Sequence, residues 1–318
     1  MPELPEVETI RLQLAPLVEG RRLERMEILD GRWSRPRPPR ELAAALEGRL
    51  VEHLDRRGKY LVWSFEDDVH LAQHLRMTGA ILSLPDSDDP AVDPPHTRVR
   101  LVLGPVERPG LLENPGRVES PGPVKRPRAV QRDREARGKR RLAIVDPRRF
   151  GTGELLLGGG ELEGFFTARL GLEPFDVRFT AQHLRGLARG RRGSIKALLL
   201  DQRRIAGVGN IYADEALFRS GIHPLRTARG VTLAQHAVLR GSLIEVLRAG
   251  IDARGATIDD FRHLDGVRGS FQDQFLVHRR ADEPCVRCGA PIVKIVAAGR
   301  GTYVCEACQP PPRGRRVR

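Results

Sequence analysis

The segments Cys285–Cys288 (CVRC) and Cys305–Cys308 (CEAC) contain all four cysteines of the chain and decide the fold of its C-terminal end. Sixteen residues separate the two pairs, a spacing typical of a zinc ribbon, in which two pairs of thiolates complete a tetrahedron around one metal ion. Between the pairs, 291–296 and 302–304 read as two strands joined by a turn at 298–301. We therefore predict one structural Zn²⁺ per chain, bound by Cys285, Cys288, Cys305 and Cys308. Two disulfide bonds are the alternative.

The compartment in which the protein resides bears on that alternative, because disulfide bonds persist in oxidising surroundings. The N-terminus is acidic and lacks the apolar core of a secretory signal peptide. The chain also has no apolar run long enough to span a membrane. We therefore expect a soluble protein of the reducing cytoplasm, which favours zinc over disulfide bonds.

The chain carries a formal net charge of +13, but this charge is unevenly distributed. Residues 107–141 hold eleven basic and five acidic residues, and the tail 309–318 adds four arginines. Both segments are rich in Pro, Gly and Arg, so we expect them to be disordered. Ten of the thirteen excess charges thus lie outside the expected folded parts. The net charge suggests a polyanionic partner, but individually placed residues must establish it.

Arginine is the prevailing basic residue of the chain, and lysine is rare. The lysines are Lys59, Lys125, Lys139, Lys196 and Lys294. Where arginine is the default cation, a retained lysine can indicate a need for a compact amine that is able to lose its proton.

The N-terminal stretch Pro2–Glu8 (PELPEVE) has the composition of a nucleophile with its own proton shuttle. Removal of the initiator methionine leaves Pro2 as a secondary amine, flanked by the carboxylates of Glu3 and Glu6. An α-amino group titrates near pH ~8, so a useful fraction is unprotonated at neutral pH. Such an amine can attack a sugar C1′ and form a cationic iminium that drives elimination. The alternative is an acidic tail that only begins a helix.

Short alternating segments dominate the first half of the chain and predict a half-buried β-sandwich. A helix comes first, and its apolar face holds Val7, Ile10, Leu14 and Val18. The clearest strands are 59–65, 97–103 and 141–145. The segment 107–140 is too long and polar for a hairpin loop, so we interpret it as an insertion.

Capped helices dominate the second half. Two short helices are expected at 181–189 and 195–201, with N-caps at Thr180 and Ser194. A capping-box pattern formed by Thr232 and Gln235 opens a longer helix that ends near Arg254.

These patterns predict an α+β multidomain protein. The expected parts are a β-sandwich domain at 1–157 with a disordered basic insertion at 107–140, a linker at 158–178, a helical domain at 179–280, the zinc ribbon at 281–309 and a disordered basic tail at 310–318.

Two internal segments combine glycine or histidine with apolar residues. In Gly207–Glu215 (GVGNIYADE), glycines lead into a helix with Asn210 as the expected N-cap, where free amides could bind phosphate. A plain helix–turn–helix joint is the alternative. In His70–Gly79 (HLAQHLRMTG), two histidines stand four apart, but the adjacent glutamate of a metalloprotease motif is missing and the segment reads as a strand. We expect no metal there.

A third segment, Asp146–Gly151 (DPRRFG), sets an aromatic residue beside two arginines directly after a strand. A side chain that wedges into duplex DNA has these surroundings. A β-turn with a buried Phe150 is the alternative reading.

Taken together, these segments resemble the formamidopyrimidine-DNA glycosylases, the bacterial family that repairs 8-oxoguanine. The resemblance runs from Pro2 to about Gln309, apart from the insertion. It rests on the ribbon and on the motifs at 2–8, 56–61, 74–79, 146–151, 207–213 and 221–224. Leu4 fits this family, because the related endonuclease VIII group, which prefers oxidised pyrimidines, usually has glycine at that position.

The resemblance implies an N-terminal β-sandwich, a helix–two-turn–helix DNA-binding domain and the zinc ribbon. It implies a bifunctional enzyme of base-excision repair, which removes 8-oxoguanine and formamidopyrimidines from duplex DNA and then cuts the strand by β,δ-elimination. Pro2 would be the Schiff-base nucleophile and Glu3 the general acid and base. Lys59 would hold the lesion phosphate and assist β-elimination, and Arg300 would assist δ-elimination.

The resemblance also implies contacts with DNA. Met77, Arg148 and Phe150 would fill the gap left by the everted base. The phosphates would be bound by His74, His96, Asn210 and Arg191, although lysine is common in the family at the position of Arg191. The loop 263–272 can cover the everted base in the family.

The expected partner is damaged double-stranded DNA, and we expect a monomer, in a bacterial cytoplasm and associated with the nucleoid. Two other functions stay open. An endonuclease VIII-like glycosylase would share the chemistry but act on oxidised pyrimidines. A noncatalytic zinc-ribbon protein that binds nucleic acid would explain the cysteines but leave Pro2 and Glu3 without a role.

Overall fold

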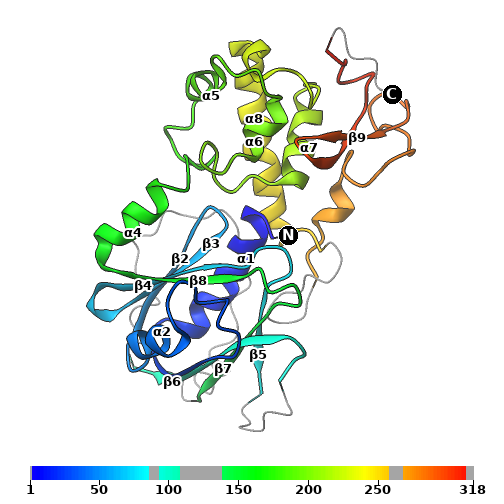
Figure 1. The fold of residues 1–318 in the computed structure, drawn as a ribbon. Coiled ribbons are helices and arrows are strands. Elements are labelled where there is room, and N and C mark those ends of the chain that lie inside the picture. The colour runs from blue at the N-terminus through cyan, green and yellow to red at the C-terminus, as the bar shows by residue number, and fades with distance from the viewer. Residues whose placement is uncertain (1, 86–92, 108–137, 258–267, 313–318) are drawn as a thin grey trace. The chain divides into compact units, whose positions relative to one another are not determined.

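The structure, a computed structural model, describes residues 2–85, 93–107, 138–257 and 268–312 and divides into two compact units (Figure 1). We call the first the sandwich unit; it comprises Met1–Pro2, Glu6–Phe165 and Thr257–Gly269. The second, the helical unit, comprises Glu3–Pro5, Phe166–Ala256 and Ser270–Arg318.

Two four-stranded antiparallel sheets form the sandwich unit, as the sequence predicts. The first sheet has the order β1-β6-β7-β5, with strands Arg21–Ile28, Thr97–Val106, Arg140–Val145 and Ala80–Leu84. The second has the order β2-β3-β4-β8, with strands Val51–Arg57, Tyr60–Phe65, Val69–His74 and Thr152–Leu157. The three strands singled out in the sequence are β3, β6 and β7, and β6 continues to Val106.

One apolar cluster holds this unit together, because both sheets contribute side chains to it. Trp63 comes from one sheet and Leu101 from the other. Helix α1 (Leu4–Val18) adds its predicted face of Val7, Ile10, Leu14 and Val18. Helix α2 (Pro39–Leu46) adds Leu42 and Leu46.

Of the expected insertion, residues 108–137 lie outside the described residues, and so do 313–318 of the expected tail. The described ends of the insertion are fixed to the first sheet. Arg21 is buried, and its Nη1 donates to the carbonyl oxygens of Gly104 and Gly138, at 2.7 Å each. Arg22 pairs with Glu107 at 2.9 Å. Both described ends of the insertion are therefore held by arginines of β1.

The helical unit contains the predicted capped helices. The expected linker begins with a helix, α4 (Gly158–Thr167). It is followed by α5 (Ala181–Ala188), α6 (Ile195–Leu200), α7 (Asn210–Arg219) and α8 (Leu233–Asp252). Thr180 and Ser194 cap α5 and α6, and Thr232 with Gln235 forms the capping box of α8. Short 3₁₀ turns lie at η4 (Ala228–Gly230) and η5 (Phe271–Gln274), and a third, η1 (Glu66–Asp68), belongs to the sandwich unit.

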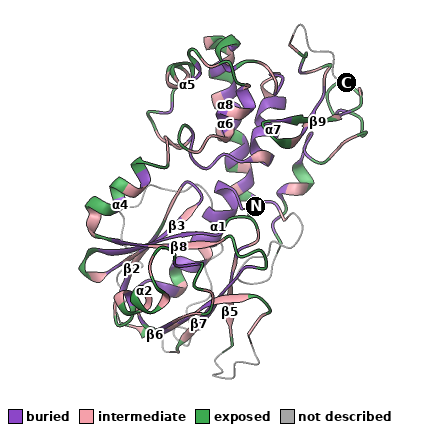
Figure 2. Ribbon diagram, viewed as in Figure 1, coloured by how far each residue is buried: buried purple, intermediate pink, exposed green. Residues whose placement is uncertain are grey.

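The predicted N-cap of α7 is wrong by one residue. Gly209 occupies the cap with extended backbone angles, and Asn210 is the first helical residue. Residues Ile211–Phe218 of this helix are all buried, so α7 runs through the interior of its unit (Figure 2).

The ribbon contributes a two-stranded sheet of β9 (Val293–Ala297) and β10 (Arg300–Val304). Ala298 and Gly299 both have positive φ, which is the geometry of a tight two-residue hairpin turn. The apolar cluster under the ribbon is small. Its buried members are Phe218, Val277, Cys285, Ile292 and Cys305.

Candidate active site and zinc centre

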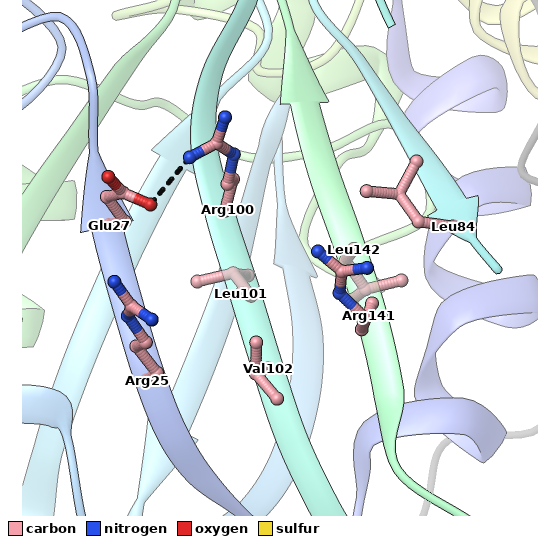
Figure 3. Close-up of a pocket in the computed structure, with 8 residues that line it drawn as sticks. All are labelled: Arg25, Glu27, Leu84, Arg100, Leu101, Val102, Arg141 and Leu142. Atoms are coloured by element: carbon pink, nitrogen blue, oxygen red, sulfur yellow. Dashed lines mark hydrogen bonds and ion pairs between the residues drawn. The ribbon is translucent and has the colours of Figure 1, made fainter. Parts of the chain in front are cut away.

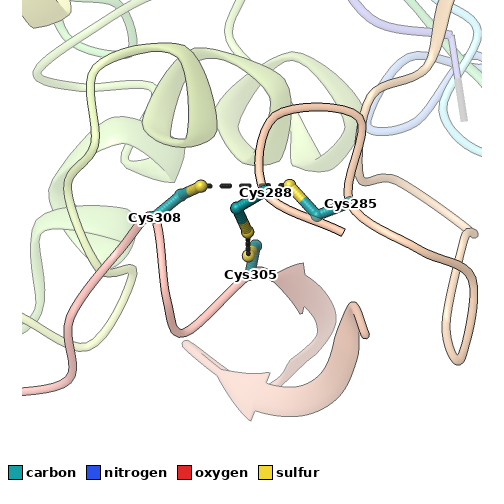
Figure 4. A group of neighbouring side chains, drawn as sticks. All are labelled: Cys285, Cys288, Cys305 and Cys308. Atoms are coloured by element: carbon teal, nitrogen blue, oxygen red, sulfur yellow. Dashed lines mark hydrogen bonds between the residues drawn. The ribbon is translucent and has the colours of Figure 1, made fainter. Parts of the chain in front are cut away.

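The four cysteine thiols of the ribbon lie together (Figure 4). All four Sγ atoms lie within 4.8 Å of one another, with 3.9 Å between Cys285 and Cys308 and 3.5 Å between Cys288 and Cys305. A disulfide bond requires about 2.05 Å, so the disulfide alternative does not fit. Thiolates placed about 2.3 Å from a zinc ion in a tetrahedron stand about 3.8 Å apart, which these positions match.

Arg287 fastens the first cysteine pair to helix α7. Its guanidinium lies 4.6 Å from the ring centroid of Phe218. It also donates to the carbonyl oxygens of Phe218 at 3.1 Å and Arg219 at 3.3 Å. These carbonyls belong to the last turn of α7, where a cation is favourable. The metal site is thus tied to the central helix of its unit.

In the sandwich unit, several predicted site residues lie along the edge formed by the strand ends of the sheet β2-β3-β4-β8. Lys59 is buried in the turn between β2 and β3, directly after Gly58, whose φ is 59°. The strand register pairs Tyr60 with His74, and His74 with Thr152. The Lys59 turn, the end of β4 and the start of β8 therefore share this edge.

A buried ion network supports the Lys59 turn. Glu8 of α1 accepts hydrogen bonds from Arg11 at 2.6 Å and from Arg56 at 2.9 Å. Arg56 also donates to the carbonyl oxygen of Gly58 at 3.0 Å. Burial alone would raise the pKa of Glu8, but the two arginines hold that pKa below its ordinary value. The turn is therefore fixed to α1 through charged groups.

Asp146 organises the loops at the same edge. Its buried carboxylate accepts from the Thr78 hydroxyl at 2.5 Å, from the Gly151 amide at 2.7 Å and from the Arg148 amide at 3.2 Å. The Asp146 amide donates to the carbonyl oxygen of His96 at 3.1 Å. One side chain thus joins the loop after β4 to the loop before β8, with His96 beside them.

These loops present three side chains to solvent. Phe150 is 49 % exposed and Met77 is 40 % exposed. The guanidinium of Arg148 lies 5.1 Å from the centre of the Phe150 ring. The alternative of a β-turn with a buried Phe150 is therefore wrong. Apolar side chains held out from fixed loops suit insertion between bases.

His74 is buried at the end of β4 and is held as a neutral ring. Burial, together with the charges of Arg76 and Lys59, lowers the pKa of His74 to about 3. The backbone amide of Arg76 donates to Nδ1 at 2.9 Å. Nδ1 is thus an acceptor, so Nε2 carries the proton and can act as a donor.

The side chains of His70 and His74 each contact protein groups. His70 contacts the Ser64 hydroxyl at 3.0 Å through Nδ1 and Asp68 at 2.9 Å through Nε2. Among the described residues, only the four cysteines form a group suited to a metal ion.

In the helical unit, Glu3 caps helix α7 from a distance of 208 residues in sequence. Its buried carboxylate accepts from the amides of Ile211 at 3.1 Å and Tyr212 at 3.5 Å. A Cβ on Gly209 would lie 2.0 Å from the Glu3 carboxyl carbon, and Gly207 has a φ of 86°. The glycines of this motif are therefore required. The first amides of α7 bind Glu3, not the phosphate that the sequence suggests.

A second buried network centres on Asp214 of the same helix. Lys196 is fully buried, and its Nζ donates to Asp214 and to the Thr302 hydroxyl, at 2.6 Å each. Asp214 also contacts His278 Nδ1 at 2.9 Å. Burial lowers the pKa of Lys196, and the charge of Asp214 opposes that shift. Sequence reasoning assigned this network no role; the rarity of lysine was its one signal.

The other predicted residues of this unit have varied surroundings. The Asn210 side-chain amide donates to the Gly301 carbonyl oxygen at 3.0 Å. Arg300 is exposed at the hairpin turn. Arg191 lies after α5 and donates from Nε to the Leu187 carbonyl oxygen at 3.0 Å. Residues 263–267 of the loop 263–272 are outside the described residues, whereas Phe271 is buried.

A cavity on the sandwich unit lies apart from these residues. It is lined by Arg25, Glu27, Leu84, Arg100, Leu101, Val102, Arg141 and Leu142 (Figure 3). These residues come from the sheet β1-β6-β7-β5, and none is a predicted site residue.

Comparison with protein families matches three parts of the chain. The formamidopyrimidine-DNA glycosylase N-terminal domain matches residues 1–153, and the H2TH domain of the same family matches 170–262. A zinc finger found in FPG and IleRS matches 282–311. Together with the thiol geometry, this match establishes a structural zinc at the four cysteines.

Curated relatives carry the same family name. The formamidopyrimidine-DNA glycosylase of Bacillus licheniformis is 37 % identical, covering 97 % of this chain and 99 % of the relative. That of Thermus thermophilus is 39 % identical, covering 97 % of this chain and 98 % of the relative.

Solved structures agree in fold. The crystal structure of MutM (Fpg) from Thermus thermophilus has a TM-score of 0.76 at 39 % identity, covering 97 % of this chain and 98 % of that one. The complex of Lactococcus lactis Fpg with DNA containing an abasic site has a TM-score of 0.80 at 30 % identity, covering 97 % and 100 %. None of the helices that the structure describes has the length and apolar character needed to cross a membrane.

Proposed function

Because this chain belongs to the formamidopyrimidine-DNA glycosylase family, we propose that it excises oxidised purines through a Schiff base at Pro2. The chain is a DNA glycosylase with AP lyase activity in base-excision repair, acting on oxidised purines and abasic sites. The observation that carries the proposal is Glu3, a buried carboxylate next to Pro2 whose two oxygens are fixed by the amides of α7.

The proposed chemistry begins with the α-amine of Pro2, after removal of Met1. Its nitrogen attacks C1′ of the damaged nucleotide, the glycosidic bond breaks, and the base leaves with a proton. Glu3 is positioned to move protons between the amine and the sugar. The attached nitrogen loses its proton and the C1′–O4′ bond opens, with a proton passing to O4′, which gives an iminium at C1′. The iminium withdraws electrons from C2′, so a C2′ proton is lost and the 3′ phosphate leaves. A second elimination releases the 5′ phosphate.

The wedge residues make this attack possible. A base inside a duplex hides C1′, so it must be everted at a cost of a few kcal/mol. We propose that Met77, Arg148 and Phe150 enter the vacated space and restore stacking there. Their exposure, 40 % for Met77 and 49 % for Phe150, supports this role.

The phosphates of the damaged strand need donors on both sides of the lesion. We assign His74, whose neutral ring offers Nε2–H, together with His96, Asn210 and Arg191. Lys59 would hold the lesion phosphate and donate a proton in the first elimination, and Arg300 would do so in the second. Damaged duplex DNA is the partner, bound by a monomer at the bacterial nucleoid.

The proposed boundaries are the β-sandwich domain at 1–157, the linker at 158–178, the helix–two-turn–helix domain at 179–280 and the ribbon at 281–309. The linker differs most from the observed divisions, because it begins with the helix Gly158–Thr167. The match of the H2TH domain also begins within it, at residue 170.

Two duplexes test the function. One carries 8-oxoguanine opposite C, and the other carries an oxidised pyrimidine. We expect cleavage of the first to products of β,δ-elimination at a rate well above that of the second. Faster cleavage of the pyrimidine duplex would indicate an endonuclease VIII-like specificity. Binding without cleavage of either would indicate a noncatalytic protein and overturn the proposal.

A further inference from the structure

The hydroxyl group of Thr302 helps to fix the hairpin that carries Arg300. Thr302 is fully buried, two residues after Arg300 on strand β10. Side chains two apart on a strand point to the same face, so both residues face the same way from the hairpin. Thr302 therefore lies where it can control the position of Arg300.

Both hydrogen-bonding roles of this hydroxyl are in use. Its oxygen accepts from Lys196 Nζ at 2.6 Å, and its proton is donated to the carbonyl oxygen of Arg300 at 3.0 Å. Lys196 is itself held by Asp214 at 2.6 Å. A rigid chain thus runs from the carboxylate of Asp214 on α7 to the backbone of Arg300.

A second contact fixes the next peptide. The side-chain amide of Asn210 donates to the Gly301 carbonyl oxygen at 3.0 Å. Two successive carbonyl groups at the start of β10, those of Arg300 and Gly301, therefore each accept a side-chain hydrogen bond. The tight turn at Ala298 and Gly299 precedes them, so the backbone at Arg300 has little freedom.

The Arg300 side chain, in contrast, is available. It is exposed, and within the described part of the chain its guanidinium makes no hydrogen bond. Its positive charge nevertheless acts on the buried Lys196, whose pKa is lowered chiefly by burial and further by Arg300.

We propose that Thr302 is a positioning residue for the second elimination, which orients Arg300 through the backbone of the hairpin. This inference rests on the proposed function, in which Arg300 assists δ-elimination. It assigns Thr302 no contact with DNA and no part in Schiff-base formation. Loss of its hydroxyl should therefore slow one step of the reaction and spare the earlier ones.

The test is single-turnover cleavage of a duplex with an abasic site, in which β- and δ-elimination products are resolved by their different 3′ ends. Thr302→Val removes the hydroxyl at constant volume. We expect it to slow δ-elimination about tenfold, the order expected for one lost hydrogen bond at a buried charge. Borohydride trapping and β-elimination should stay within about twofold of the wild type, and Thr302→Ser should restore δ-elimination.

Val296→Thr is the matched control, because it exchanges the same two residue types at a site of the same hairpin that is 73 % exposed. It should leave the product ratio unchanged. In the background Arg300→Ala, adding Thr302→Val should have no further effect on δ-elimination, because the two residues act in series. An additional loss there would contradict the proposal.

Zinc content and thermal unfolding are measured for each variant. If Thr302→Val loses zinc, Thr302→Ala removes the hydroxyl without placing a methyl group against Lys196, and its product ratio decides. An unchanged β-to-δ ratio in a folded variant, or equal slowing of trapping and both eliminations, overturns the inference. A wild-type chain that neither traps nor cuts DNA would instead overturn the proposed function.

Discussion

In the sandwich unit, Asp146 joins the loops 75–79 and 146–151, which we call the loop edge. The loop edge and the Arg300 hairpin of the helical unit both present exposed side chains with proposed roles, but they are fixed by different means. At the loop edge, Asp146 holds loops that rest on a large apolar core shared by two sheets. The Arg300 hairpin rests on a small apolar cluster and relies on the cysteine cluster and on Lys196. Buried charged groups serve both regions, but the loop edge also rests on a large apolar core, whereas the small ribbon depends on its metal.

The largest expected effect follows from removal of the metal. Cys288→Ser, or chelation of zinc, should unfold the ribbon and lower affinity for lesion DNA by more than about a hundredfold, because structural zinc contributes on the order of 10 kcal/mol to such small domains. The sandwich unit should keep its sheets. The measurements are zinc analysis, DNA binding and circular dichroism.

Val286→Ser is the control for that experiment, since it introduces serine at an exposed position within the same knuckle. It should retain zinc and affinity. A fully active preparation without zinc would show that the hairpin does not need the metal.

The second prediction concerns the loop edge. Asp146→Asn removes the charge of the carboxylate that accepts from Thr78, Arg148 and Gly151. Weakening these buried hydrogen bonds should destabilise the complex with the everted base by about 1–3 kcal/mol. The excision rate should therefore fall roughly tenfold to hundredfold. The fold should persist, because the apolar core is untouched. Single-turnover excision and thermal unfolding measure the two effects.

Asp176→Asn is the matched control. Asp176 also accepts from the amide two residues ahead, that of Arg178, but in an exposed turn. Its substitution should leave excision unchanged. Equal effects of the two variants would mean that Asp146 has no special role at the loop edge.

The third prediction is a dependence of stability on pH. The pKa of His74 is lowered to about 3 in the folded protein by burial, whereas an unfolded histidine titrates near ~6.5. Below pH ~6.5 the unfolded chain therefore binds a proton that the folded chain does not. The free energy of unfolding should fall by about 1.4 kcal/mol per pH unit as the pH drops towards 3.

His74→Asn tests this directly, because asparagine keeps an acceptor for the Arg76 amide but cannot titrate. Urea unfolding between pH 7 and pH 5 should show a shallower slope with pH for the variant than for the wild type. Identical slopes would mean that His74 is not held neutral.

The smallest expected effect concerns the insertion. Deletion of 110–137 should leave the fold and single-turnover chemistry intact, because it retains Glu107 and Gly138, through which Arg22 and Arg21 fix the two ends of the insertion to the first sheet. Affinity for undamaged DNA should weaken, and its salt dependence should become flatter by ~0.9 in log–log slope for each lost phosphate contact. An unchanged slope would show that the insertion does not touch DNA.

Local patterns predicted what depends on neighbours in sequence. The alternation of 59–65 gave β3, Thr180 and Ser194 gave two helix starts, and the cysteine spacing gave the metal site. Helix α2 was not predicted, since its eight residues follow a proline-rich stretch without a capping side chain.

Long-range polar contacts lay beyond such patterns. Glu3 meets Ile211 across 208 residues, and Lys196 meets Thr302 across 106. No periodicity relates such positions, because only the tertiary fold brings them together. The N-cap of α7 is Gly209 and not the predicted Asn210 for the same reason. Glycine has no side chain to accept from the first helical amides, and the distant carboxylate of Glu3 accepts from them instead.

The central claim, that the Pro2 nitrogen is the nucleophile, is tested most directly by peptide mapping of the borohydride-trapped complex with 8-oxoguanine DNA. The adduct should lie on Pro2, and a chain extended before Pro2 should bind DNA but neither trap nor cut it, because an amide nitrogen has no available lone pair. Lys59→Ala should bind more weakly yet still trap. An adduct mapped to Lys59, or trapping by the extended chain, would contradict the claim.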